Sequence, residues 1–478
     1  MRPTPPAELS REDMWEIILD LRATVSRLEE KISLLEKENQ ALKEELRDSK
    51  RAKAPFSKGT RKPNPKPPGR KPGQGNFTHR TAPTSTPDDE VREINVTIEA
   101  DQRQCPQCQT PLDITIETAT TEDTPPAPRR LITCFKVEVG KCPHCNFQTR
   151  AKHPELGPAQ NGATAHTVGP HVMAQALDLH YGLGLPLRKV PQVILDLTGI
   201  SLTQSALTQR ACHLCDPGGL LEPTYQTLRT EVINSPVLHT DDTGWRIDAV
   251  LAFVMGFFTD KTAYYQIRYQ HRCEEVQEVI SPDHQGTVVT DRGSTYRAKC
   301  FDNIAMQRCL SHLLKNITKV EEQKTGKAKA FATALKEQLK AANDLWKGYR
   351  AKELSRDEYR RRGGEIKETL DYLLRDRQLT DVDNQRLLNG IGLEHDKGRL
   401  LLFLEEPEVP PTNNHAERQL RPAVIARKVS QCSKNDRGAN TYATLKSIVQ
   451  TFKLRSINAV KGLTKLLKGE TFKEVIEC

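Results

Sequence analysis

The chain has 478 residues, of which 36% are hydrophobic, and 71 Lys and Arg against 62 Asp and Glu give it a formal charge of +9. This length suits two to four domains with at least one substantial core, and the positive balance favours an anionic partner such as nucleic acid. No apolar run approaches the ~20 residues of a membrane span and no signal peptide starts the chain, so we expect a soluble, cytoplasmic protein without a membrane partner.

A leucine-zipper coiled coil is predicted at residues 14–47, where hydrophobic residues repeat every seven positions. The repeat comprises Ile18, Val25, Ile32, Asn39 and Leu46 and, three residues later, Leu21, Leu28, Leu35 and Leu42. Ile and Val at the first position with Leu at the second favour two parallel strands, and the single polar residue Asn39 would fix their register. The alternative is a helix packed on its own domain, but the charged surroundings leave only a narrow seam to bury. We expect a homodimer or a larger oligomer.

A basic linker is predicted at residues 48–88, which are rich in Pro, Lys, Arg and Gly. The segment has too little apolar surface to fold, so we expect it to be disordered. Its charges could neutralise several phosphates and give a salt-dependent affinity that ignores base sequence. The alternative interpretation is a soluble spacer.

A zinc finger is predicted at residues 95–152 from two CPxC units. Each unit has the spacing with which two thiolates bind one tetrahedral ion, and four sulfur ligands suit a single structural Zn²⁺ with no open position for catalysis. In a long chain without an export signal, these cysteines favour metal over disulfides and indicate a reducing compartment. The four predicted ligands are Cys105, Cys108, Cys142 and Cys145.

A helical domain is predicted at residues 160–234. It contains one helix that ends at Gly199 and a second that follows Ser201, a pattern that resembles a helix-turn-helix. The second helix would enter the major groove of DNA, although two helices joined by a Gly turn are common without DNA. The CHLC stretch at 212–215 has no matching pair, so we expect it to lie in the core.

Strands are predicted from residue 235 onward, where the hydrophobic period changes to two. The first strand carries Asp241 to its C-terminal end, two apolar strands follow as a hairpin, and a fourth strand ends in Asp291 before a short strand and a helix. Three antiparallel strands, a parallel strand that ends in an acid, and a late acid on a helix are the order of a ribonuclease-H-like core. Its two parts would occupy residues 235–320 and 395–478, separated by a Lys-, Glu-, Leu- and Ala-rich helical insertion at 321–394.

The late acid is Glu417, which lies in the stretch NNHAERQLRPAVIARK. An ordinary acid in the first turn of a helix is one interpretation. We favour a metal ligand, because Asp241, Asp291 and Glu417 together could hold two divalent ions, Mg²⁺ or Mn²⁺, roughly 4 Å apart on either side of a scissile phosphodiester. The cations nearby would then hold the DNA backbone: Arg418, Arg421, Arg427 and Lys428.

The motifs HTDDTGW, VVTDRGSTY, CLSH and NNHAERQLRPAVIARK, preceded by the zipper and the paired CPxC units, resemble bacterial transposases of the insertion sequence 66 family. The resemblance spans nearly the whole chain. It implies a DDE transposase that cuts and joins element ends on double-stranded DNA, with Asp241, Asp291 and Glu417 as its acids and the element's accessory proteins as candidate partners. The family usually has Asp-Glu-Thr where this chain has Asp241-Asp242-Thr243. We expect Asp242 to face the opposite side of the strand.

The CLSH stretch resembles a Cys-x-x-His motif that relatives with such insertions often carry. Its residues Cys309 and His312 are two ligands without a second pair, which does not favour zinc. We expect His312 to support the structure or position a strand, with a satisfied core histidine as the alternative. The family typically carries Arg after this motif, whereas this chain reads LLKN.

The sequence therefore predicts a multidomain protein of α+β and α/β class: a coiled coil, a zinc finger, a helical domain and a catalytic core that a helical insertion interrupts. The competing function is a catalytically inactive, dimeric zinc-finger regulator that binds DNA. We favour the enzyme, because a decayed copy would have no reason to retain all three acids.

Overall fold

The computed structural model describes residues 11–51, 131–133, 139–141, 143–145, 147–150, 168–293, 295–430 and 432–477. Contacts divide the chain into two compact units, residues 1–124 and 125–478, which are described separately. Most of the predicted linker and three predicted zinc ligands, Cys105, Cys108 and Cys142, lie outside the described residues. The fourth, Cys145, is an exposed free cysteine next to two short antiparallel strands, β1 (Val139–Lys141) and β2 (Gln148–Arg150).

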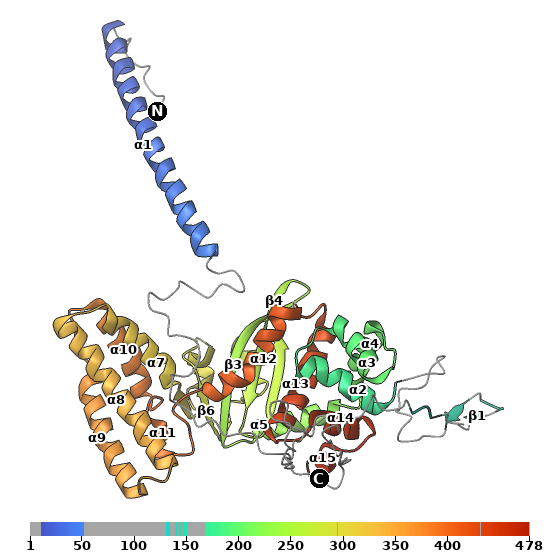
Figure 1. Cartoon of the computed structure of the whole chain (residues 1–478). Coiled ribbons are helices and arrows are strands. Elements are labelled where there is room, and N and C mark those ends of the chain that lie inside the picture. Colours follow the sequence, from blue (N-terminus) through green and yellow to red (C-terminus); the bar gives the residue numbers. More distant parts are fainter. Residues whose placement is uncertain are drawn as a thin grey trace, which may run out of the picture. The chain divides into compact units, whose positions relative to one another are not determined.

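In the first unit the structure describes one helix, α1 (Arg11–Arg51), drawn in blue in Figure 1. A helix is therefore confirmed where the heptad repeat predicts one. Within the described part of this unit the heptad seam faces water, because five of its side chains are 52% to 57% exposed: Leu21, Val25, Leu28, Ile32 and Leu35. The partner helix that would cover this seam stays a prediction.

The second unit is built on a five-stranded mixed sheet in the order β5-β4-β3-β6-β7. Strand β4 (Val250–Phe258) pairs antiparallel with both β3 (Val237–Ile247) and β5 (Ala263–Arg268), whereas β6 (Thr287–Thr290) pairs parallel with β3 and β7 (Met306–Arg308) parallel with β6. The sequence predicts this succession of three antiparallel strands, a parallel strand and a short strand. Figure 1 shows the long β3 and β4 at the centre of the unit.

Strand β3 does not end at Asp241, as the sequence analysis predicted, but continues to Ile247. The extension forms because Trp245 and Ile247 are buried and β3 pairs with β4 from His239 to Ile247. A two-residue turn then joins the two strands, with Asp248 and Ala249 both at positive φ, the backbone of a type I′ hairpin turn. The acid therefore lies within β3, just beyond the end of the neighbouring strand β6.

One hydrophobic cluster joins the sheet to the helices before and after it. Helix α13 (Asp436–Leu454) covers the edge strand β5: Ser447 and Thr451 accept hydrogen bonds from the backbone N–H groups of Tyr265 and Ala263, at 2.9 and 3.0 Å. These bonds satisfy a strand edge that would otherwise be open to pairing with another chain. The other helices of the cluster are α2 (Pro170–Leu177), α3 (Val190–Thr198), α4 (Gln204–Cys215), α5 (Glu222–Ile233), α12 (Asn414–Ser430), α14 (Ala459–Leu467) and α15 (Phe472–Ile476).

The predicted helix pair before the sheet is α3 and α4. Helix α3 ends at Gly199, whose φ of 66° is the left-handed conformation that favours glycine, and the Thr203 side chain caps α4 by accepting from the Ala206 N–H. Both cysteines of the CHLC stretch, Cys212 and Cys215, are buried, which confirms that they belong to the core. Contact of α4 with DNA stays a prediction.

The predicted insertion is helical and has a hydrophobic cluster of its own. Its helices are α8 (Gly326–Arg350), α9 (Arg356–Leu374) and α10 (Val382–Asp396), and they pack with α7 (Leu310–Glu322) and α11 (Leu402–Glu405). In Figure 1 they lie beside β6, across the sheet from α2 and α4. Of the helices that the structure describes, none is both long and apolar enough to cross a membrane.

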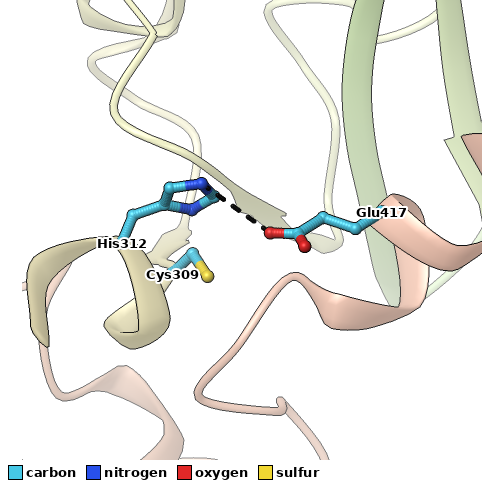
Figure 2. Close-up of side chains that lie close together, drawn as sticks. All are labelled: Cys309, His312 and Glu417. Carbon is cyan, nitrogen blue, oxygen red and sulfur yellow. Dashed lines mark ion pairs between the residues drawn. The ribbon is translucent and has the colours of Figure 1, made fainter. Parts of the chain in front are cut away.

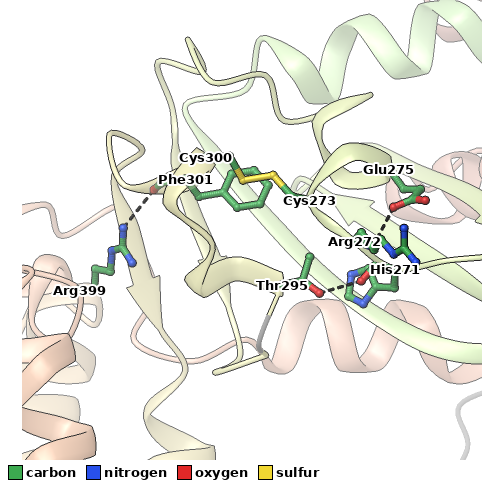
Figure 3. Close-up of a disulfide and its surroundings, with 8 residues drawn as sticks. All are labelled: His271, Arg272, Cys273, Glu275, Thr295, Cys300, Phe301 and Arg399. Atoms are coloured by element: carbon green, nitrogen blue, oxygen red, sulfur yellow. Dashed lines mark hydrogen bonds between the residues drawn. A yellow bond between two sulfur atoms is a disulfide. The ribbon is translucent and has the colours of Figure 1, made fainter.

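A disulfide joins Cys273, the first residue of the short helix α6 (Cys273–Gln277), to Cys300 (Figure 3). The metal binding expected from the cysteines concerns the two CPxC units, and a reducing compartment stays a prediction. The bond ties the segment after β5 to the loop between β6 and β7, where Phe301 accepts a hydrogen bond from Arg399 through its backbone carbonyl at 3.0 Å. Sequence spacing could not indicate this pair, because folding brings the two cysteines together.

Candidate active site

Asp241 and Asp291 lie side by side because of the register between β3 and β6. Val237 pairs with Thr287 and His239 with Val289, so the same parallel register brings Asp241 level with Asp291, the residue after β6. Both acids are half-buried. The Asp241 Oδ1 atom accepts the backbone N–H of Asp242 at 3.0 Å, and the Asp291 Oδ1 atom accepts that of Gly293 at 2.8 Å.

The charges of the other two predicted acids act on Asp241. Burial raises the pKa of Asp241 to about 7, against a backbone hydrogen bond that lowers it, and the charges of Asp291, Asp242 and Glu417 raise it further. Neighbouring carboxylates repel one another, so a cation among them would stabilise their ionised form. Hard oxygen ligands of this kind suit Mg²⁺ or Mn²⁺. The donor set therefore fits the divalent ions that the sequence predicts.

Glu417 lies in the first turn of α12, which packs on the sheet through small residues. Its backbone N–H donates to the Asn413 carbonyl at 3.2 Å. Its Oε1 atom lies 3.7 Å from His312 Nε2 and is shielded from solvent without a hydrogen-bond partner among the described residues (Figure 2). An ordinary first-turn acid faces water, so this placement favours a ligand role. The residues that seat the helix on the sheet are Ala416, Leu420, Ala423 and Ala426.

A buried amide, Asn413, links the segments that carry the acids. Its Nδ2 donates to the Thr240 carbonyl at 2.8 Å, its Oδ1 accepts from His239 Nδ1 at 3.1 Å, and its backbone N–H donates to Cys309 Sγ at 3.1 Å. Burial, with a contribution from His415, lowers the pKa of His239 to about 4, so this histidine is neutral at pH 7. No local sequence pattern indicates this role of Asn413, because its partners lie far away in the chain.

A buried arginine, Arg308 at the end of β7, holds the loop of Asp291. Its guanidinium donates to the Asp291 carbonyl at 3.0 Å, to the Tyr296 carbonyl at 2.8 Å and to Glu394 Oε2 at 2.9 Å. Glu394 belongs to α10 of the insertion, which therefore supports the loop of a candidate catalytic acid. The sequence alone does not indicate this pair, since no local pattern shows that an Arg in a short strand is buried.

Asp242 lies on the other face of β3, as strand alternation predicts. Its Oδ1 atom is 3.3 Å from His271 Nδ1, and the neighbouring Thr240 hydroxyl on the same face is 2.8 Å from the Tyr296 hydroxyl. Burial raises the pKa of Asp242, the His271 charge lowers it, and Asp291 raises it. Asp241 and Asp242 thus lie in different environments. The Glu417 charge is among those that act on Asp241 and not among those that act on Asp242.

The four predicted DNA-binding cations of α12 differ in their surroundings. Arg427 is half-buried and donates to Thr243 Oγ1 at 3.3 Å and to the Gly244 carbonyl at 2.5 Å, so it holds the helix against β3. Arg418, Arg421 and Lys428 are exposed. Only these three present their charges to the surface, where phosphates could reach them.

The chain also matches a known protein family. The family model described as "Transposase IS66 family" matches residues 166–441, more than half of the chain. Among curated proteins, none matches the sequence. The matched segment contains the whole sheet, the helical insertion and the three predicted acids.

Proposed function

The chain belongs to the transposase IS66 family, and on this premise we propose that it is a DDE transposase with a ribonuclease-H-like core, which cuts DNA at insertion-sequence ends and joins them to a target. The observation that carries the proposal is the parallel register that brings Asp241 of β3 level with Asp291 after β6, together with the Glu417 charge that acts on Asp241 from the first turn of α12. The strand order β5-β4-β3-β6-β7, with the acids on β3 and after β6, supports the same core.

In the proposed site Asp241, Asp291 and Glu417 would hold two divalent ions, Mg²⁺ or Mn²⁺. Bound there, such ions supply charge stabilisation for the attacking and leaving oxygens of a phosphodiester. The chain's own contribution is to fix these ligands before DNA arrives. Asn413 holds the β3 backbone next to Asp241 against the start of α12, and Arg308 holds the Asp291 backbone.

The reaction proceeds in two displacements. Water first attacks the phosphodiester at the element end and leaves a 3′ hydroxyl on one fragment and a 5′ phosphate on the other. That 3′ hydroxyl then attacks a phosphodiester of the target, forms a new ester bond and releases a 3′ hydroxyl of the target strand. Arg418, Arg421 and Lys428 are exposed on the helix that carries Glu417, where their charges would hold the DNA backbone.

The proposed enzyme works as an oligomer in the cytoplasm. Cys105, Cys108, Cys142 and Cys145 would hold one structural Zn²⁺, and α1 would pair with α1 of a second copy. The exposed seam of α1 supports the pairing, because a helix this charged has no other apolar face to bury. Deletion of residues 1–47 should lower the mass measured by light scattering to that of one chain. An unchanged mass would exclude the zipper as the basis of assembly.

The experiment that tests the enzyme is incubation of the full chain with DNA that carries the element's ends and Mg²⁺ or Mn²⁺. Strand breaks at those ends that disappear when the metal is chelated are the expected result. Binding to the ends without breaks under any of these conditions would favour the alternative, an inactive DNA-binding regulator.

A further inference from the structure

Three metal-binding side chains from two helix starts meet beside the proposed active site. Cys309 immediately precedes α7, His312 lies in the first turn of α7, and Glu417 lies in the first turn of α12 (Figure 2). One ligand atom from each lies within 4.8 Å of the other two, and His312 Nε2 is 3.7 Å from Glu417 Oε1. Two ligands of one tetrahedral zinc ion lie about 3.3–3.8 Å apart, so the site needs a closure of at most roughly 1 Å.

We propose that Cys309, His312 and Glu417 bind a thiophilic transition-metal ion, with Zn²⁺ as the best fit, and that this ion inhibits DNA cleavage by occupying Glu417. The inhibition rests on the proposed function, whereas the binding does not. In the sequence, the Cys-x-x-His stretch offers two ligands only. Folding supplies the third from a helix that starts about a hundred residues later.

The polar atoms of this cluster lack the partners that such atoms normally have. Among the described residues, neither His312 Nδ1 nor Glu417 Oε1 has a hydrogen-bond partner, although both atoms are shielded from solvent. Polar atoms removed from water without a partner cost free energy, and a bound ion would compensate the carboxylate oxygen directly. The unpartnered Glu417 oxygen supports a ligand at this place independently of the distances.

The sulfur of Cys309 has surroundings that suit a metal-bound thiolate. Cys309 is fully buried, and its Sγ accepts the backbone N–H of Asn413 at 3.1 Å. A hydrogen bond to the sulfur is the kind of outer-shell contact that orients a metal ligand. Burial also limits access of oxidants to the sulfur.

The choice of ion follows from the donor types. Sulfur and imidazole ligands suit Zn²⁺, whereas Mg²⁺ prefers oxygen and gains little from a thiolate. Three protein ligands leave one coordination position for water. An ion bound to Glu417 and His312 would occupy the carboxylate that the proposed Mg²⁺ site needs as its third acid. We therefore expect competition between Zn²⁺ and Mg²⁺ for one carboxylate.

Binding is tested by equilibrium dialysis of the full chain against Zn²⁺, with metal counted per chain. The wild type should bind one ion more than Cys309→Ser and His312→Gln, because the predicted finger contributes equally to all three. Loss of a direct ligand should weaken this ion at least about 100-fold, since even an outer-shell loss typically costs 10–100-fold. The matched control is Cys212→Ser, a buried cysteine of α4 whose sulfur accepts from the Thr441 hydroxyl at 3.4 Å. It should bind as the wild type does.

Equal zinc content and affinity in the wild type, Cys309→Ser and His312→Gln would overturn the site. The His312 side chain is 41% exposed, so His312→Gln should fold even if Cys309→Ser does not, and circular dichroism checks both. In the cleavage assay at fixed Mg²⁺, Zn²⁺ should inhibit the wild type, and His312→Gln should need at least about tenfold more Zn²⁺ for the same inhibition. Unchanged cleavage by wild type that holds the extra ion would overturn the inhibition. If the variants lose the extra ion but the wild type does not cleave DNA at all, the proposed function is contradicted and the metal site still stands.

Discussion

The two sides of the candidate active site are built by different means. Asp241 and Asp291 are brought together by strand register and supported from behind by α13, whose hydroxyls bond to β5. Glu417 stands in the first turn of α12, whose start is held by hydrogen bonds of Asn413 to Cys309 and to the Thr240 carbonyl. Backbone pairing leaves little freedom, whereas a few side-chain contacts can be changed one at a time. The first side is therefore expected to be rigid and the second adjustable.

The largest loss of cleavage should come from substitution of the three acids themselves, on either side of the site. Asp241→Asn, Asp291→Asn and Glu417→Gln keep nearly the same shape and remove the charge that would hold the cations. A bound ion contributes several kcal/mol to the transition state, so cleavage should fall about 1,000-fold or more while DNA binding persists. Rates of strand breakage and a gel-shift assay measure the two quantities.

Asp242→Asn is the matched control for these variants. Its carboxylate contacts His271 on the other face of β3, so cleavage should fall far less than with Asp241→Asn. If Asp242→Asn were the more damaging change, the ligand would be the second acid of the pair. If Glu417→Gln retained cleavage with unaltered metal dependence, the triad would fail and Glu417 would be an ordinary first-turn acid.

The next effect concerns the buried ion pair that supports the Asp291 loop. Arg308→Leu leaves the buried Glu394 with only the longer ion pair to Arg297, at 3.5 Å, so the free energy of unfolding should fall by up to about 3–5 kcal/mol. Denaturant titration measures it. The control is Arg361→Leu, which removes exposed pairs with Glu358 and Glu365 and should cost far less. Equal costs for the two variants would show that the insertion does not stabilise the rigid side.

A smaller effect on stability should follow from a change on the adjustable side. Asn413→Ala removes the partner of His239 and of the Thr240 carbonyl, which should cost about 1–3 kcal/mol of unfolding free energy. Because Asn413 supports ligands without being one, cleavage should fall about 10–100-fold. The exposed neighbour gives the control, since Asn414→Ala should change neither quantity appreciably. Cleavage at the wild-type rate by Asn413→Ala would refute the positioning role.

The same comparison separates what the sequence could predict from what it could not. Alternation along residues 237–242 and the apolar runs after it predict the strands, and parallel register then brings Asp241 and Asp291 together. Asn413, Arg308 and the contact of Cys309 with Glu417 depend on side chains that meet across long sequence separations. The secondary-structure propensity of a residue does not indicate which distant side chains it will contact. The length of β3 was missed for a related reason, because its second half is defined by pairing with β4.

The smallest effect is a pH dependence from the helix that supports the rigid side. Lys446 of α13 is buried and donates to the Tyr181 carbonyl at 3.0 Å. Burial, followed by the nearby charge of Lys453, lowers the pKa of Lys446 to about 7 from its ordinary 10.5, while Asp178 opposes the shift. Between these two values the unfolded chain binds a proton that the folded protein does not, so stability rises with pH and is lost again as pH falls to 7.

From pH 7.5 to 9.5 the unfolding free energy of the wild type should rise more steeply than that of Lys446→Met, by up to about 1.4 kcal/mol per pH unit. Lys473→Met, which changes an exposed lysine, should keep the wild-type slope. Identical slopes in the wild type and Lys446→Met would mean that α13 admits water around Lys446, and that the support of the sheet is looser than the packing indicates.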